Sequence, residues 1–410
     1  MNWPIACVQL CFTLGWTVYV IFLPALLTRA GIDASWLPWI LIVDQLLFAA
    51  ADLAFGIWMD RSVQFFQKVA TWLTALVLLS CAGFAALPFL AQLLPAWFFV
   101  CALFLWVLCS SVLRVPPLAM LGKFAVPSQP DTLHTPVAAY LFGLGIAGAI
   151  APYLTVLLKH RDPLLPFIVA SVALAMATLV LRRALVSAGA ASSPSGMSGT
   201  IAAGTATPMP PTARRAIARP LLIAIVLFAL GMQIHSGVNS AKLFTTAAPG
   251  VPLEWLMPLF WAGFSVAMFP VSVWLTRHAQ HDTQSDVPPT HFLWLAGVLG
   301  GVALVGCATQ PTLPLLIALQ IIAGAMWAAV LLAAITAATL IGRTGREGGW
   351  IGATMALLAL ATVGRIALVL AIAPGTSSDA GRWIADVLPW LSGGAWLFAA
   401  AVLTVFAVRR

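Results

Sequence analysis

The sequence predicts an all-α membrane protein with twelve transmembrane helices in two related six-helix bundles. Of the 410 residues, 62% are hydrophobic and only 8% are charged, whereas a soluble domain of this length needs far more charge to cover its surface. Apolar segments of about 20 residues, each long enough to cross roughly 30 Å of hydrocarbon as a helix, recur along the whole chain. One long interruption near the middle divides these segments into two sets of six.

The first bundle, residues 1–186, is expected to contain six helices. Their approximate spans are 4–28, 36–59, 69–91, 95–121, 135–158 and 163–185. The first span lacks a basic leader and a small-residue cleavage site, so we expect it to stay in the mature chain. All six are continuously apolar, which favours helices, because the strands of a membrane barrel alternate polar and apolar residues.

A flexible linker and a second bundle are predicted to follow. Residues 187–219 are rich in Ala, Gly, Ser, Thr and Pro, a composition that cannot build a core. The bundle of residues 220–410 has the spans 220–244, 253–276, 291–309, 312–341, 348–373 and 383–408. Trp39 and Arg61 bracket the second span as Trp255 and Arg277 bracket the eighth. Repeated units of this kind are common in secondary transporters, which bind substrate between the repeats.

The distribution of Lys and Arg predicts which side of the membrane each loop faces. With both termini inside, the inner loops and tail carry Arg61, Lys68, Lys123, Arg182, Arg183, Arg214, Arg215, Arg219, Arg277, Arg343, Arg346, Arg409 and Arg410. The outer loops carry only Arg29, Lys159, Arg161 and Arg382. Because inner loops hold the excess of basic residues, we expect cytoplasmic termini and a cell-membrane location, in a bacterial inner membrane. The net charge of +8 then reflects topology and not nucleic-acid binding.

The end of the second span carries a short signature. Gly56, Asp60 and Arg61 form the pattern G-x-x-x-D-R in front of an expected cytoplasmic loop, which resembles the signature of the major facilitator superfamily. The resemblance implies the major facilitator fold and a gating role for these three residues. The glycine permits close approach of helices, and the charged pair can bond helix ends of the other half while the cytoplasmic side is closed.

A finer resemblance is to the glycoside–pentoside–hexuronide:cation symporters, the melibiose permease-like family. Asp52 lies four residues before Gly56, and the run Arg114-Val-Pro-Pro-Leu is similar to that family's fourth helix. The resemblance implies that Asp52 couples transport to a cation. Where the family carries an acidic residue in the fourth helix, this chain has Arg114, and the family's fifth-helix Arg is Val137 here. Sugar specificity and sodium dependence are therefore not implied.

Charged residues inside the predicted helices are candidate site residues, because a charge in hydrocarbon costs at least about 2.5 kcal/mol and needs a partner or a wet cavity. Counted at 1.5 Å per residue from the cytoplasmic ends, Asp52 and Arg114 both lie roughly 12 Å deep and are expected to pair. The pair could be a permanent brace or the coupling site. Asp44 and Arg365 lie roughly 24–26 Å deep, and we predict that they form a gating ion pair that closes the outer side in the inward-facing state.

His235 and Asn239 in the seventh span are candidate substrate-binding residues. The seventh helix usually lines the cavity in the superfamily that this chain resembles, and Gln233, Ser236 and Ser240 lie close in sequence. The alternative for His235 is a packed, hydrogen-bonded side chain inside the bundle.

Together these observations predict a secondary active transporter that moves a small polar or anionic solute by alternating access, in symport with a cation, a proton in preference to sodium. Proton-coupled efflux of drugs or metabolites and a non-transporting membrane receptor are the alternatives. The sequence has no common catalytic or phosphate-binding motif and no metal-ligand spacing, so we expect neither an enzyme nor a bound metal or cofactor. We expect the protein to act as a monomer in the lipid bilayer.

Overall fold

The computed structural model describes residues 2–61, 66–124, 131–191, 211–281, 290–342, 345–372 and 379–408. Every regular element in these ranges is a helix, and twelve helical segments are long and apolar enough to cross a membrane. The predicted helical class and number of spans are confirmed, and the chain is a multi-pass membrane protein.

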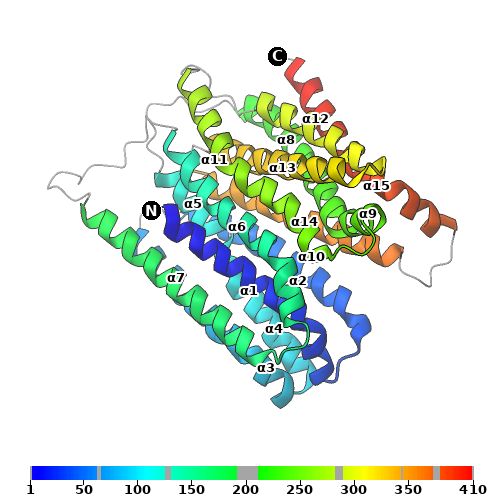
Figure 1. Ribbon diagram of the computed structural model, residues 1–410. Coiled ribbons are helices and arrows are strands. Elements are labelled where there is room, and N and C mark those ends of the chain that lie inside the picture. Colours follow the sequence, from blue (N-terminus) through cyan, green and yellow to red (C-terminus); the bar gives the residue numbers. More distant parts are fainter. Residues whose placement is uncertain are drawn as a thin grey trace.

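The first six spans begin with a long helix and include one broken span (Figure 1). They are formed by α1 (Asn2–Arg29), α2 (Leu37–Arg61), α3 (Phe66–Leu93), α4 (Ala96–Ser110) with α5 (Val115–Phe124), α6 (Asp131–Leu158) and α7 (Leu164–Ala191). α1 packs against α6 and α7, while α3 packs against α4 and α7. These contacts bury the aromatic and aliphatic side chains of one bundle.

The second six spans contain a local change of helix type. They are formed by α8 (Pro211–Ile234), the π-helical turn η4 (His235–Asn239) and α9 (Ser240–Ala247), then α10 (Leu253–Leu256) with α11 (Pro258–His281), α12 (Thr290–Ala308), α13 (Leu313–Gly342), α14 (Glu347–Ala371) and α15 (Asp379–Val408). α15 packs against α8 and α12, and α13 packs against α11, α12 and α14. The second bundle is thus also held together by its own helix contacts.

The predicted linker is described only at its ends. α7 continues to Ala191 and α8 begins at Pro211, so both helices extend into the range 187–219. Residues 192–210 lie outside the described residues, as do three of the basic residues used for topology, Arg343, Arg409 and Arg410. The domain boundaries and the side of the membrane that holds the termini therefore stay predictions. The side on which α1 begins and α2 ends is called the terminal side below.

Among the described residues, the most extensive contacts between the bundles are those of α2 with α14 and of α6 with α11, and α5 with α14 and α6 with α13 add further contacts. Between α6 and α11, a Cβ added to Gly145 would fall 2.6 Å from the ring of Phe264. Tyr153 of α6 also meets Trp255 of α10, with their ring centroids 5.6 Å apart. Small residues that admit large neighbours are typical of packing between membrane helices, and here they bring the two bundles into direct contact.

Candidate functional site

A carboxylate joins the terminal-side ends of α2 and α14. Asp60, at the end of α2, accepts hydrogen bonds from the backbone N–H groups of Gly348 (2.7 Å) and Gly349 (2.8 Å) in the first turn of α14. Such N–H groups have no partner within their own helix, and the helix dipole favours a negative charge beside them. Asp60 is therefore a helix cap that one bundle supplies to the other.

Glycines let the backbones of α2 and α14 touch next to this cap. A Cβ added to Gly56 would lie 2.9 Å from the carbonyl carbon of Gly348 and closer still to its oxygen. A Cβ on Gly352 would likewise collide with the carbonyl oxygen of Asp52. Arg61 is exposed at the end of α2. The two helices thus close against each other on the terminal side with no side chain between them.

The predicted pair of Asp52 and Arg114 is confirmed. Arg114 Nη2 lies 2.9 Å from Asp52 Oδ2, and Nε lies 3.2 Å from Oδ1 and 3.1 Å from Oδ2. The side chain of Asp52 is fully buried, whereas that of Arg114 keeps 19% of its surface exposed. The guanidinium also lies over the ring of Phe48, 4.6 Å from its centroid. The buried carboxylate therefore has a cation partner with a fixed orientation.

A break in the fourth span places Arg114. A 3₁₀ turn covers Ser111–Leu113, between the end of α4 and the start of α5. Pro116 and Pro117 lack amide protons and clash with the carbonyls one turn before them, so regular helical bonding cannot continue through this point. The hydroxyl of Tyr140 on α6 donates to the carbonyl of Arg114 at 3.4 Å, which helps to satisfy the interrupted backbone.

Arg114 also contacts the other bundle. Its Nη2 donates to the carbonyl oxygen of Met355 on α14, at 3.4 Å. The same guanidinium thus bonds Asp52 within the first bundle and a backbone group of the second. Any motion that separates α2 from α14 on the terminal side removes one of the two partners of Arg114.

Asp44 and Arg365 do not form an ion pair in this conformation. Asp44 is fully buried, and its Oδ2 accepts a hydrogen bond of 2.7 Å from the hydroxyl of Tyr19. Its other oxygen, Oδ1, has no hydrogen-bond partner. The ring of Tyr19 contacts those of Trp16 and Trp106, both at 4.9 Å between centroids. The carboxyl group therefore lies among aromatic rings without a cation.

Arg365 lies across the π-helical turn. A Cβ added to Gly237 would fall 2.6 Å from Arg365 Cδ and 2.9 Å from Nη1, so this arrangement requires a glycine. The Nε atom is buried and has no hydrogen-bond partner. One turn before Arg365, Thr362 accepts a hydrogen bond of 2.8 Å from the side-chain amide of Gln233 on α8. All three of these side chains, Arg365, Thr362 and Gln233, keep part of their surface exposed.

His235 is packed inside the second bundle. Its side chain is 1% exposed, and Nε2 donates to Gln320 Oε1 on α13 at 3.0 Å. The hydroxyl of Ser240 donates to the carbonyl of His235 at 2.9 Å and lies 3.4 Å from the amide nitrogen of Gln320. In this conformation the geometry matches the alternative considered for His235, a packed and hydrogen-bonded side chain.

Asn239 bonds to a different helix of the same bundle. Its Nδ2 donates to the carbonyl of Leu388 (3.0 Å) and to the hydroxyl of Ser392 (2.9 Å), both on α15. The structure therefore does not bring His235 and Asn239 together with Asp52 and Arg114. The two residues instead tie the π-helical turn to α13 and α15 on opposite sides.

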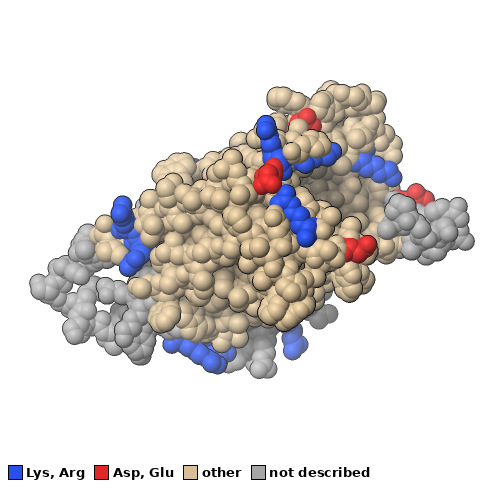
Figure 2. Space-filling view, turned by 90° about the horizontal axis from the view of Figure 1, so that it is seen from below, with Lys and Arg blue, Asp and Glu red and all other residues tan. Residues whose placement is uncertain are grey.

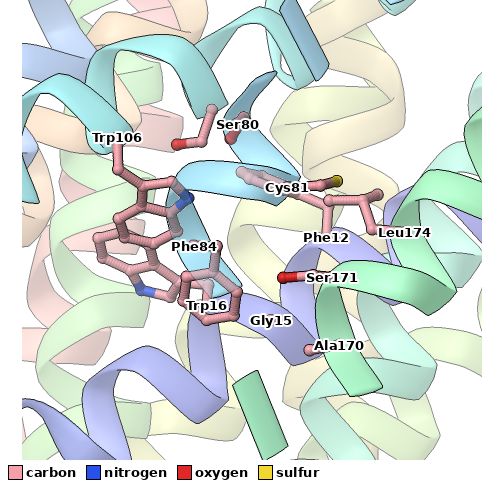
Figure 3. Close-up of a pocket in the computed structure, with 11 residues that line it drawn as sticks. Phe12, Gly15, Trp16, Ser80, Cys81, Phe84, Trp106, Ala170, Ser171 and Leu174 are labelled. Carbon is pink, nitrogen blue, oxygen red and sulfur yellow. The ribbon is translucent and has the colours of Figure 1, made fainter. Parts of the chain in front are cut away.

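The first bundle contains a small, mainly apolar cavity with a few hydroxyl groups in its lining (Figure 3). It has room for about one water molecule. Its lining comes from α1, α3, α4 and α7 and comprises Phe12, Gly15, Trp16, Ser80, Cys81, Phe84, Trp106, Ser110, Ala170, Ser171 and Leu174. The hydroxyl of Ser171 is buried without a hydrogen-bond partner, while that of Ser110 donates to the Val107 carbonyl at 2.8 Å. The cavity is too small for a transported solute.

Charged side chains border a recess on one face of the molecule. Figure 2 shows Lys, Arg, Asp and Glu gathered around a hollow in the right-hand part of that face, beside a broad area without charge. Among the described residues, no group of three or more His, Cys, Asp or Glu side chains could hold a metal ion.

Sequence reasoning missed several residues of this arrangement. Gln320 could have been found as a polar side chain in an otherwise apolar helix. Gly348 and Gly349 bond through backbone groups, which leave no signal in the sequence. The carbonyl of Met355 is equally invisible there, because any residue supplies one.

The sequence matches no protein-family model and no curated protein, but solved structures share its fold. A bacterial homologue of the iron transporter ferroportin in the outward-facing state has a TM-score of 0.69 at 15% identity, over 100% of this chain and 99% of that one. The major facilitator superfamily transporter FucP in the outward conformation has a TM-score of 0.63 at 15% identity, over 99% and 97%. The human organic anion transporter MFSD10 has a TM-score of 0.61 at 14% identity, over 98% of each chain.

These similarities extend over the whole of each chain at low sequence identity, so they concern the arrangement of the helices. They confirm the expected superfamily fold, while the finer resemblance to glycoside–pentoside–hexuronide symporters stays a prediction. The chain therefore has the fold of the major facilitator superfamily of transporters.

Proposed function

We propose that this protein is a secondary active transporter that moves a small polar or anionic solute by alternating access. One observation carries the proposal: the bundles are bonded together on the terminal side through Asp60 and the Gly56 contact, whereas Asp44 and Arg365, deeper along the same two helices, are unpaired with each other. An interface that is closed at one end and polar beyond it is what alternating access requires. The match to two transporters solved in outward states adds support.

The excess of Lys and Arg in the loops on the terminal side supports cytoplasmic termini. With that orientation, the side closed by Asp60 is cytoplasmic. We propose that the conformation is outward-facing, with Tyr153 of α6 and Trp255 of α10 still in contact near the outer ends of their helices. The protein would work in a cell membrane, for which we propose a bacterial inner membrane, and as a monomer, since each chain holds both bundles.

The cytoplasmic gate would consist of Gly56, Asp60 and Arg61. Asp60 stabilises the closed state by capping α14, and Gly56 allows the approach that brings the cap into reach. Arg61 adds a positive charge on the same side. When this gate opens, Asp60 loses its hydrogen bonds to the N–H groups of α14 and accepts hydrogen bonds from water.

Coupling to a cation, a proton in preference to sodium, is proposed for Asp52 and Arg114. Support comes from the bond between Arg114 and Met355, because opening of the cytoplasmic side breaks it and admits water to a carboxylate that is otherwise fully buried. The occupancy of Asp52 by a cation would then depend on which side is open. His235 and Asn239 would contribute by holding the π-helical turn next to Arg365, and not as direct ligands.

The ion pair of Asp44 and Arg365 is proposed for the inward-facing state, where the outer side closes. We expect Asp44→Asn to slow transport and to reduce the population closed on the outer side, because an amide gives the guanidinium no charge partner. The measurement is the distance between spin labels at Thr28→Cys and Thr245→Cys, which are exposed on that side, with uptake assayed in parallel. Asp33→Asn, an exposed carboxylate near the same side, is the matched control. Wild-type uptake with unchanged distances in Asp44→Asn would exclude the pair.

Two other functions make different predictions. Proton-coupled efflux would move solute out in exchange for protons, and a receptor would move nothing. The test is uptake of a panel of labelled metabolites into proteoliposomes with an imposed proton gradient, sodium gradient or neither, with protein-free liposomes as the control. Accumulation driven by protons moving in the same direction supports symport. Movement opposite to the protons supports efflux, and the absence of any flux across the panel contradicts transport.

A further inference from the structure

We propose that Arg365, together with Gln233 and Thr362, forms a subsite that binds an oxyanion, the carboxylate or phosphate group of the transported solute. The inference rests on the proposed function and names its substrate class. It starts from a guanidinium that has five N–H donors. Among the described residues, this guanidinium has no acidic partner, and its Nε is buried without an acceptor.

The chain is built around this side chain. Gly237 leaves the space through which the Arg365 side chain passes, since a Cβ there would collide with Cδ and Nη1. The π-helical turn that holds Gly237 is fixed on both sides, by His235 to Gln320 and by Asn239 to Ser392. Single π-turns occur often at functional sites. The turn beside Arg365 therefore has a fixed shape, which distinguishes this arginine from one on an open surface.

The neighbours of Arg365 supply polar groups without negative charge. Gln233 and Thr362 bond each other, both are half-buried, and both lie within one turn of the residues that contact Arg365. α8 packs against α14, and α14 also packs against α2 of the first bundle, so these residues lie on helices next to the interface between the bundles. The Thr362 hydroxyl donates to the Leu358 carbonyl at 3.2 Å and so orients Gln233, whose amide keeps a second N–H to donate. The arginine fork itself suits the planar geometry of a carboxylate or the oxygens of a phosphate.

The buried charges of the described spans point in the same direction. Asp52 and Arg114 neutralise each other, and Asp44 bonds only to Tyr19. In the outward-facing conformation, which would receive the solute, Arg365 is the cation of these spans that has no anionic partner. In the opposite conformation, the proposed bond to Asp44 would replace the solute and so assist its release.

The test measures ligand binding by thermal unfolding of the purified, detergent-solubilised protein, followed by tryptophan fluorescence. The probes are succinate, gluconate and glycerol 3-phosphate, each beside its uncharged counterpart succinamide, glucose or glycerol. We expect at least one oxyanion to raise the unfolding midpoint while its counterpart does not. The carboxylates and the phosphate separate the two kinds of oxyanion.

Variants assign the effect to the subsite. Arg365→Gln should weaken binding by about tenfold to a hundredfold, and Arg365→Lys by less, because lysine keeps the charge and loses the fork. Gly237→Ala should weaken binding by displacing the side chain, whereas Gly394→Ala, with open space around its Cβ position, should not. Arg29→Gln, which removes a surface arginine paired with Asp162, is the matched charge control and should bind as the wild type does.

The ligand-free unfolding midpoint separates a binding role from a purely structural one. Because Arg365 has no partner to lose, Arg365→Gln should not unfold at a lower temperature than the wild type. Equal binding by Arg365→Gln and wild type, or no stabilisation by any oxyanion of the panel, would overturn the subsite. The binding assay needs no ion gradient and is therefore independent of transport. If the protein binds oxyanions through Arg365 but transports none of them, the proposed transport function is contradicted and the subsite is not. If the protein transports a neutral solute, and Arg365→Gln transports it as well as the wild type does, the subsite is contradicted and the transport function is not.

Discussion

Arg114→Gln is expected to destabilise the protein strongly and to abolish coupled transport. The substitution leaves the carboxylate of Asp52 fully buried without its cation, and breaking a buried ion pair in this way costs about 3–5 kcal/mol. The double variant Asp52→Asn with Arg114→Gln leaves no unpaired charge and should regain most of the lost stability. Thermal unfolding of the purified variants, followed by tryptophan fluorescence, measures both effects.

The double variant also separates a brace from a coupling site. If the pair couples transport to a cation, the folded double variant should exchange solute across the membrane but should not accumulate it against a gradient. Accumulation at the wild-type level in the double variant would mean that the pair only holds the first bundle together. A double variant as unstable as Arg114→Gln itself would contradict the assigned electrostatic cause.

Asp60→Asn is expected to shift the protein towards the state that is open on the terminal side. Asparagine keeps one acceptor oxygen but loses the negative charge that both N–H groups of α14 share. Hydrogen bonds to charged groups contribute about 1.5–3 kcal/mol each, so losing the charge-assisted part should change the ratio of states by roughly 10-fold to 100-fold. Distances between spin labels at Ser187→Cys and Arg277→Cys, exposed on different bundles, report the shift.

Two further variants assign this shift to the gate. Gly56→Ala should open the same side while leaving the Asp60 carboxylate unchanged, because its Cβ meets the backbone of Gly348 and pushes α14 away from α2. Asp33→Asn removes a carboxylate that accepts a bond from the Ser35 N–H in its own loop, and it should leave the distances unchanged. Distances in Asp60→Asn identical to those of the wild type would show that the cap contributes little to closure.

The helices could be predicted from the sequence, and so could the part of the candidate site that Asp52 and Arg114 form. Lipid selects continuous apolar segments, so the spans are visible in the composition, and Asp52 and Arg114 could be paired by depth alone. The facing direction of His235 and Asn239 could not be predicted, because the π-helical turn rotates the residues that follow it. The bonds of Asp60 use only backbone donors. Asp44 and Arg365 are not paired in the conformation described, and the pairing predicted for another conformation is untested because a sequence carries no conformational state.

The π-helical turn at His235–Asn239 also affects how this chain is aligned with others. Such a turn holds one more residue than the α-helical turn it replaces, and each residue of an α-helix adds about 100° of rotation. In a relative that lacks the extra residue, the segment matching α9 falls into register only after a gap of one position within the turn. An ungapped alignment would pair every later residue of that span with a neighbour on the wrong face.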